Sequence, residues 1–124
     1  MTLAERPADL DIALYRGDTP RWSVVLPWDL TGGAVRLQVR DARDRALVSL
    51  SSLAGGGLFL EPNAPAAGSS RVRMRALTAQ EEAAVVAAES PAYDLEARFA
   101  GGQVWTVLRG RFAVARDVTR MAPP

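Results

Sequence analysis

The chain alternates between apolar and polar residues over most of its length, at the period of two that is typical of strands with one buried face. The clearest stretch is residues 35–39, where Val35, Leu37 and Val39 face inward and the residues between them are polar. At residues 10–15 the same alternation places Leu10, Ile12 and Leu14 on one face and Asp11 and Tyr15 on the other. Further stretches occur at residues 22–26, 46–50, 58–61, 72–76, 93–99 and 103–117. The pattern predicts about seven or eight short strands.

Glycines make two specific predictions within this pattern. Gly101 and Gly102 separate two alternating stretches, and such a pair is typical of a tight hairpin turn. Gly110 lies in the middle of the last stretch, where a glycine indicates a bulge or a bend between two sheets. The long final strand is therefore expected to change direction at Gly110.

One helix is predicted at about residues 79–89. Thr78 and Glu81 stand three residues apart and form a capping box, in which each side chain accepts a hydrogen bond from the backbone of the other. The segment that follows is rich in alanine and glutamate, which favour helix. Pro91 ends the helix, because the residue before a proline avoids helical geometry.

Many short strands at regular spacing, with one short helix, predict an immunoglobulin-like antiparallel β-sandwich. The 124 residues, 48% of them hydrophobic, are enough for one core. The expected organisation is an N-terminal arm at residues 1–9, a single domain at residues 10–120 and a C-terminal tail at residues 121–124. Tyr93 follows the helix at the start of a strand. That position suits the tyrosine corner of sandwich domains, whose hydroxyl bonds to backbone upstream.

The composition excludes several kinds of site. There is no cysteine and no histidine, so the chain offers neither a thiolate nor an imidazole as a catalytic base or as a metal ligand. It has no phosphate-binding loop, dinucleotide fingerprint or nucleophile elbow. Asp94 and Glu96 share one strand face and form a conceivable acid–base pair, but charge balance with neighbouring arginines is the favoured reading. We therefore expect no enzymatic activity, no cofactor and no metal site.

The basic residues are all arginine, and the net charge is +1. So small an excess predicts neither a nucleic-acid nor a membrane partner. Two arginine rows share strand faces: the first row is Arg36 and Arg40, and the second row is Arg71, Arg73 and Arg75. Each row is a candidate interface for an acidic partner. The alternative is a solvated outer face, on which the first row pairs with the acidic residues of the 93–99 strand if the two strands are neighbours.

Trp28 is the best single candidate for a contact anchor, because it lies in a loop beside a proline and tryptophan is enriched in binding hot spots. Packing at the end of the sandwich is the alternative reading for Trp28. Trp22 and Trp105 lie within strands and are expected in the core. The N-terminus lacks the apolar segment of a secretory signal, so we expect synthesis in the cytoplasm.

Three stretches together carry a family resemblance: residues 30–32 leading into 35–40, residues 93–96 followed by 101–104, and residues 108–114 followed by 117–120. The series resembles small structural proteins of tailed bacteriophages. It is similar in layout to the immunoglobulin-like N-terminal domain of phage baseplate upper proteins and tail-fibre attachment proteins. The resemblance spans residues 10–120.

This resemblance implies a virion protein that docks in the tail, baseplate or fibre-attachment region and acts without catalysis. Its partners would be other virion proteins, and it would be a homo-oligomer or a multi-copy component. A first alternative is a capsid cement or decoration protein that binds the major capsid protein. A second alternative, from another class, is a cellular carbohydrate- or peptide-binding sandwich, which predicts an exposed aromatic platform.

Overall fold

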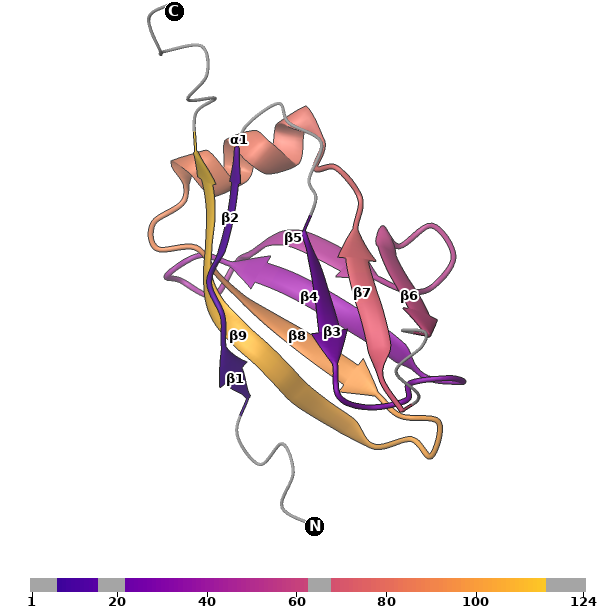
Figure 1. Ribbon diagram of the computed structural model, residues 1–124. Helices are drawn as coiled ribbons and strands as arrows, with labels where there is room; N and C mark the ends of the chain where they lie inside the picture. Colours follow the sequence, from indigo (N-terminus) through magenta and orange to yellow (C-terminus); the bar gives the residue numbers. More distant parts are fainter. Residues whose placement is uncertain (1–6, 16–21, 63–67, 116–124) are drawn as a thin grey trace, which may run out of the picture.

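A computed structural model describes residues 7–15, 22–62 and 68–115 (Figure 1). The expected tail at residues 121–124 and most of the expected arm lie outside these ranges. The described chain forms nine strands and one helix: β1 (Ala8–Asp9), β2 (Ile12–Tyr15), β3 (Ser23–Leu26), β4 (Ala34–Arg40), β5 (Ala46–Ser51), β6 (Leu58–Pro62), β7 (Ser70–Met74), α1 (Ala79–Ala87), β8 (Ala92–Arg98) and β9 (Val104–Ala115).

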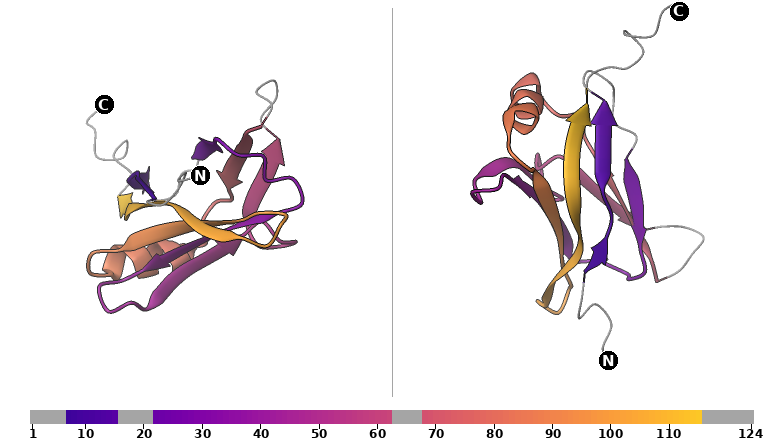
Figure 2. Two further views of the ribbon diagram at one scale, coloured as in Figure 1. Left: turned by 90° about the horizontal axis from the view of Figure 1, so that it is seen from below. Right: turned by 90° about the vertical axis from the view of Figure 1, so that its left-hand side faces the viewer.

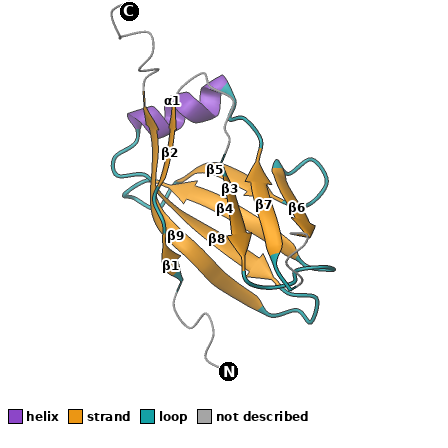
Figure 3. Ribbon diagram, in the orientation of Figure 1, coloured by secondary structure: helices purple, strands orange, loops and turns teal. Residues whose placement is uncertain are grey.

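The strands form two sheets that pack as a sandwich (Figures 2 and 3). The large sheet has the order β9-β8-β4-β5, and both β1 and β2 pair with β9; the small sheet has the order β3-β7-β6. When the strands from β3 onward take the letters B, C, C′, D, E, F and G, these sheets read G-F-C-C′ and B-E-D. That is the strand order of an immunoglobulin-like sandwich. The predicted β-sandwich with one short helix is therefore confirmed.

The core lies between the two sheets and follows the predicted alternation. Val35, Leu37 and Val39 of β4 are buried, and their partners in β8 are also buried. The small sheet contributes Val72 and Met74 from β7. Because alternate residues of a strand face opposite sides, the polar residues between these positions form the two outer faces of the sandwich.

The first predicted strand, at residues 10–15, corresponds to β2; the short strand β1 precedes it, and both run parallel to β9. The prediction that all strands are antiparallel is thus wrong for these two pairings. Strand β1 begins at Ala8, inside the segment expected to be an arm, and it pairs with β9 at Leu108 and Arg109. Ile12 is buried and Leu14 packs against the core, as the alternation predicts, but Leu10 lies between β1 and β2 and is 40% exposed, so its predicted place on their face is wrong.

Gly110 is the residue of β9 that faces the junction between β1 and β2. A Cβ atom at this position would lie 2.3 Å from the carbonyl oxygen of Leu10. Real Cβ atoms do not approach backbone so closely, so glycine is required here for the first strand to reach β9. Gly110 therefore allows the backbone of β9 and the backbone at Leu10 to approach each other closely.

The bulge predicted at Gly110 lies elsewhere in β9. Leu95 pairs with Leu108 and the next residue, Glu96, pairs with Thr106, so Val107 is the extra residue. Gly110 keeps a regular partner in β8. The bulge has a physical reason, because it brings both Val107 and Leu108 into the core and so buries more apolar surface.

Tyr93 ties the first strand to the large sheet. Its side chain is buried, its ring packs edge-on against Phe112 at 6.3 Å, and its hydroxyl donates a hydrogen bond of 2.5 Å to the carbonyl oxygen of Leu10. Burial, together with the charges of Asp11 and Asp94, raises the pKa of Tyr93 to about 12. The hydroxyl does bond to upstream backbone, but the acceptor is 83 residues away in sequence.

Helix α1 crosses from the small sheet to the large sheet at one end of the sandwich (Figure 1). The predicted capping box is present: Thr78 accepts from the amide of Glu81, and Glu81 accepts from the amide of Thr78. Glu81 also binds Arg75 through two hydrogen bonds of 2.7 and 3.0 Å, and this pairing lowers the pKa of Glu81. At nine residues, α1 is the single helix of the described residues and is too short to span a bilayer.

We expect Gly110→Ala to destabilise the fold by about 1–3 kcal/mol, because the added methyl group forces the first strand away from β9. Gly101→Ala is the matched control, since a Cβ atom there meets nothing within 4 Å. Urea unfolding followed by circular dichroism measures both variants. Equal destabilisation of the two would contradict the close approach.

Tyr93→Phe removes the hydrogen bond to Leu10 and is expected to cost about 0.5–1.5 kcal/mol at neutral pH. The phenol ionises near pH 10 in the unfolded chain and near pH 12 in the folded protein. Its contribution to stability is therefore complete below pH 10 and is lost as the pH rises toward 12. Urea unfolding at pH 8, 10 and 11 should show a smaller advantage of the wild type at each step, and a constant advantage would refute the assignment.

Candidate docking surface on the large sheet

The first arginine row lies on the outer face of the large sheet. Strands β4 and β8 are neighbours, and Arg36 forms an ion pair of 3.0 Å with Glu96 directly opposite. Arg40 pairs instead with Asp44 at 3.5 Å and donates to Gln38, the residue that stands opposite Asp94 in the sheet. The predicted cross-strand pairing is therefore present for Arg36 and absent for Arg40.

The second arginine row does not join the first. Arg71 and Arg73 lie on the outer face of the small sheet, where Arg71 donates to Ser23 at 3.4 Å. Arg73 pairs with Glu61 at 3.2 Å, and its guanidinium carbon lies 5.4 Å from the centre of the Phe59 ring. Arg75 binds the helix through Glu81. All three arginines thus have partners inside the fold.

Trp28 packs within an aromatic cluster at the end of the sandwich. Its ring meets Phe99 at 6.0 Å and Trp105 at 6.3 Å, and these two rings lie 4.9 Å apart, all in edge-to-face geometry. Trp28 is half-buried, and its indole nitrogen is buried without a hydrogen-bond partner in the described part of the chain. The geometry is that of a packing contact rather than a flat exposed platform.

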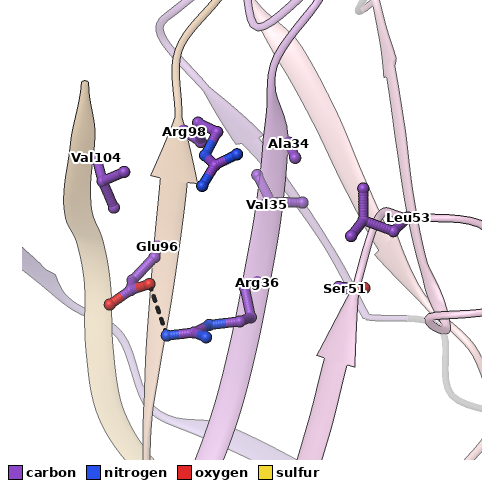
Figure 4. A pocket seen from close by; sticks show the side chains of 8 residues that line it. All are labelled: Ala34, Val35, Arg36, Ser51, Leu53, Glu96, Arg98 and Val104. Atoms are coloured by element: carbon purple, nitrogen blue, oxygen red, sulfur yellow. Dashed lines mark hydrogen bonds and ion pairs between the residues drawn. The ribbon is translucent and has the colours of Figure 1, made fainter. Parts of the chain in front are cut away.

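A shallow depression of about 310 Å³ lies on the large sheet at the end remote from α1. Eight residues line it, and they include Ala34, Arg36, Leu53, Glu96, Arg98 and Val104 (Figure 4). Ala34 leaves a low point between larger neighbours in the sheet. Leu53 is 68% exposed and Val104 is 50% exposed, so two large apolar side chains face solvent beside it. We call these six residues the β-sheet depression.

Leu53 is held in place by the backbone of its loop. Ser52 is fixed to β4 in both directions, because its amide donates to the Val35 carbonyl and its hydroxyl accepts from the Val35 amide, both at 2.9 Å. The amide of Gly56 donates to the Leu53 carbonyl at 2.8 Å. A Cβ atom at Gly56 would lie 2.4 Å from the carbonyl oxygen of Ser51, so the turn is tightly closed. A fixed loop presents Leu53 at little entropic cost on binding.

Sequence reasoning found Arg36 and Glu96 but not the rest of the depression. The hairpin predicted at Gly101 and Gly102 brings Arg98 and Val104 together, but nothing in the sequence places Leu53, which comes from a loop, beside them. One signal was present in the sequence: Leu53 is an isolated large apolar residue in a stretch of serine, alanine and glycine. Such a residue has no strand face to bury it, so its exposure could have been inferred.

Three carboxyl groups, those of Asp29, Asp41 and Glu81, are held as charged hydrogen-bond acceptors. The Thr31 hydroxyl lowers the pKa of Asp29, and the Arg45 backbone amide does the same for Asp41. Both Asp41 and Glu81 are fixed by arginine as well. Within the described residues no group of three or more acidic side chains is placed to hold a metal ion. These arrangements suit structural roles.

Comparison with known proteins leaves the family open. No family model matches the sequence, and no curated protein matches it. Among solved structures, the chain is similar to one from the crystal structure of the ZIG-8-RIG-5 IG1-IG1 heterodimer, monoclinic form, with 12% identity over 90% of this chain and 89% of that chain. The TM-score is 0.39, so the fold assignment rests on the strand order and not on this similarity.

The Arg36–Glu96 pair is exposed and is expected to contribute less than about 1 kcal/mol. The Arg75–Glu81 pair is half-buried and doubly hydrogen-bonded, so its coupling energy should exceed about 1 kcal/mol. Double-mutant cycles with alanine at each pair, measured by urea unfolding, test the difference. Equal coupling energies would contradict the expectation that the more buried Arg75–Glu81 pair is the stronger of the two.

Proposed function

We propose that this protein is a non-enzymatic structural protein of a tailed-bacteriophage virion that docks in the tail, baseplate or fibre-attachment region. The observation that carries the proposal is the β-sheet depression, where a fixed loop presents Leu53 at one side and Val104 is exposed at the other, with Ala34 and Arg98 between them. Exposed apolar side chains that are gathered and held rigidly are typical of surfaces that bind another protein. The resemblance of residues 10–120 to phage attachment domains supports the virion as the setting.

The same surface suits a multi-copy assembly. One depression of this size buries too little area for a tight complex on its own. In a symmetric particle each copy makes the same contact, and linked contacts raise the overall affinity without any new interaction. A rigid sandwich with modest contacts is therefore sufficient for such a role.

The carbohydrate-binding alternative receives less support. Trp28, Phe99 and Trp105 do gather at one end of the sandwich, although they are far apart in sequence. Their rings pack edge to face, so each covers part of its neighbour. A sugar-stacking platform needs a ring whose flat face is open to solvent.

The decisive experiment is cryo-electron microscopy of the native particle that carries this gene, with the chain located in the density. Density at the tail tip, baseplate or collar is the expected result. Density at repeated positions on the capsid shell would replace the proposal with the cement alternative. Absence of the chain from the particle would overturn both virion roles.

Leu53→Ser is expected to lower the occupancy of this protein on particles about tenfold, because the anchor of the depression is lost. The free energy of unfolding should change by less than about 0.5 kcal/mol, since Leu53 is exposed in the free protein. Quantitative mass spectrometry of purified particles measures the occupancy. Val86→Ser, at a half-exposed position on α1, is the matched control and should retain full occupancy; loss with both variants would contradict the assignment.

A further inference from the structure

We propose that the β-sheet depression binds an extended acidic segment of a partner protein. In this complex an aliphatic side chain of the partner packs over Ala34 against Leu53, and a neighbouring aspartate or glutamate side chain pairs with Arg98. The inference rests on the proposed docking function, and it adds the chemistry of the occupant.

The charges around the depression do not balance. Arg36 and Glu96 neutralise each other through their 3.0 Å ion pair. Arg98 is exposed on the same strand as Glu96, two residues further along, and it has no ion pair with any residue in the described ranges. The depression therefore carries one positive charge in excess, located at Arg98.

Most other arginines on the outer faces form an ion pair with an acidic residue of the same chain. Arg40, Arg73 and Arg109 each have an acidic partner within 4 Å, at Asp44, Glu61 and Asp9. Arg98 also lies beside exposed apolar side chains. An arginine that has no acidic partner in the described part of its own chain and lies next to exposed apolar side chains can form an ion pair with a carboxylate of a bound protein.

A second copy of this chain is a poor occupant. In a two-fold symmetric contact the same patch faces itself, so each Arg98 would approach a surface that carries the same excess positive charge. Like charges brought together in an interface are unfavourable. An acidic partner removes this cost and supplies the missing carboxylate.

The positions of the side chains indicate the form of the partner segment. Figure 4 shows the Arg98 side chain on β8 between Val104 and Ala34, with Leu53 on the far side of β4. In an extended chain, residues two apart lie on one face at about 7 Å. An aliphatic residue and an acidic residue at that spacing can contact the apolar surface of Ala34 and Leu53 and the guanidinium group of Arg98 together. The planar guanidinium can bind both carboxylate oxygens.

The test uses short synthetic peptides and the full protein labelled with ¹⁵N. Two capped peptides are compared, Gly-Ser-Leu-Ser-Glu-Gly and Gly-Ser-Leu-Ser-Lys-Gly, and a second pair with the leucine and charged residue exchanged covers the opposite chain direction. Each is titrated to about 10 mM, because a contact this small is expected to bind in the millimolar range. The amide signals of Ala34, Leu53, Arg98 and Val104 report binding.

We expect the glutamate peptide of at least one direction to bind about fivefold more tightly than its lysine counterpart. Arg98→Glu should reverse this preference, and Leu53→Ser should weaken both peptides. Arg111→Glu is the matched control: Arg111 is exposed on β9 toward the other end of the sheet, so the preference should remain. A reversal of specificity cannot arise from loss of folding, which the dispersed amide spectrum also monitors.

Equal binding of the glutamate and lysine peptides, or no shift at the four reporter amides with any peptide, would overturn the inference. The outcome is separable from that of the proposed function. If the protein is located in the particle and Arg98→Glu is incorporated normally, the function stands and the acidic occupant is wrong. If the protein is absent from the particle but the peptide preference reverses, the occupant stands and the virion role is wrong.

Discussion

The fold depends on one contact, at which the Leu10 carbonyl lies against Gly110 and accepts a hydrogen bond from the Tyr93 hydroxyl. Strand β9 follows β8 through a hairpin, and its other edge would be open without the first strand. The contact holds β1 and β2 along that edge, in a parallel pairing that no local turn can produce. Covering this edge removes a site for unwanted strand addition, and the cost is a glycine and a buried phenol at fixed positions.

The same frame positions the β-sheet depression. The β8–β9 hairpin sets Arg98 opposite Val104, and the β4–β8 register sets Ala34 on the other side of Arg98. These positions are therefore determined by backbone hydrogen bonds. Leu53 is added by a loop that is bonded to β4 through Ser52. Because each element is held by backbone contacts, the surface is formed before a partner arrives, and binding does not have to order it.

The charged side chains of this protein mainly stabilise its fold. Glu81 links the helix cap to Arg75, which directly follows β7 of the small sheet, and Asp41 holds the turn that joins β4 to β5. Exposed pairs such as Arg36–Glu96 contribute little to stability, since water screens them. Their effect is to neutralise charge on the outer faces, so an arginine such as Arg98, which has no ion pair in the described residues and lies beside exposed apolar side chains, becomes distinctive. Specificity at such a surface comes from where the charge is left unbalanced.

Sequence alone determined the elements of this protein, because alternation and capping are local. The strands around Val35 and Leu95, the helix after Thr78 and the absence of thiol and imidazole chemistry all followed from residues close together in the chain. Tertiary structure decided which strands are neighbours, where β9 bulges and which of the described arginines have an acidic partner. Alternation assigns a residue to a face but carries no information about the strand beside it. The roles of Gly110 and Arg98 are set by residues distant in sequence, and only the folded chain brings those residues together.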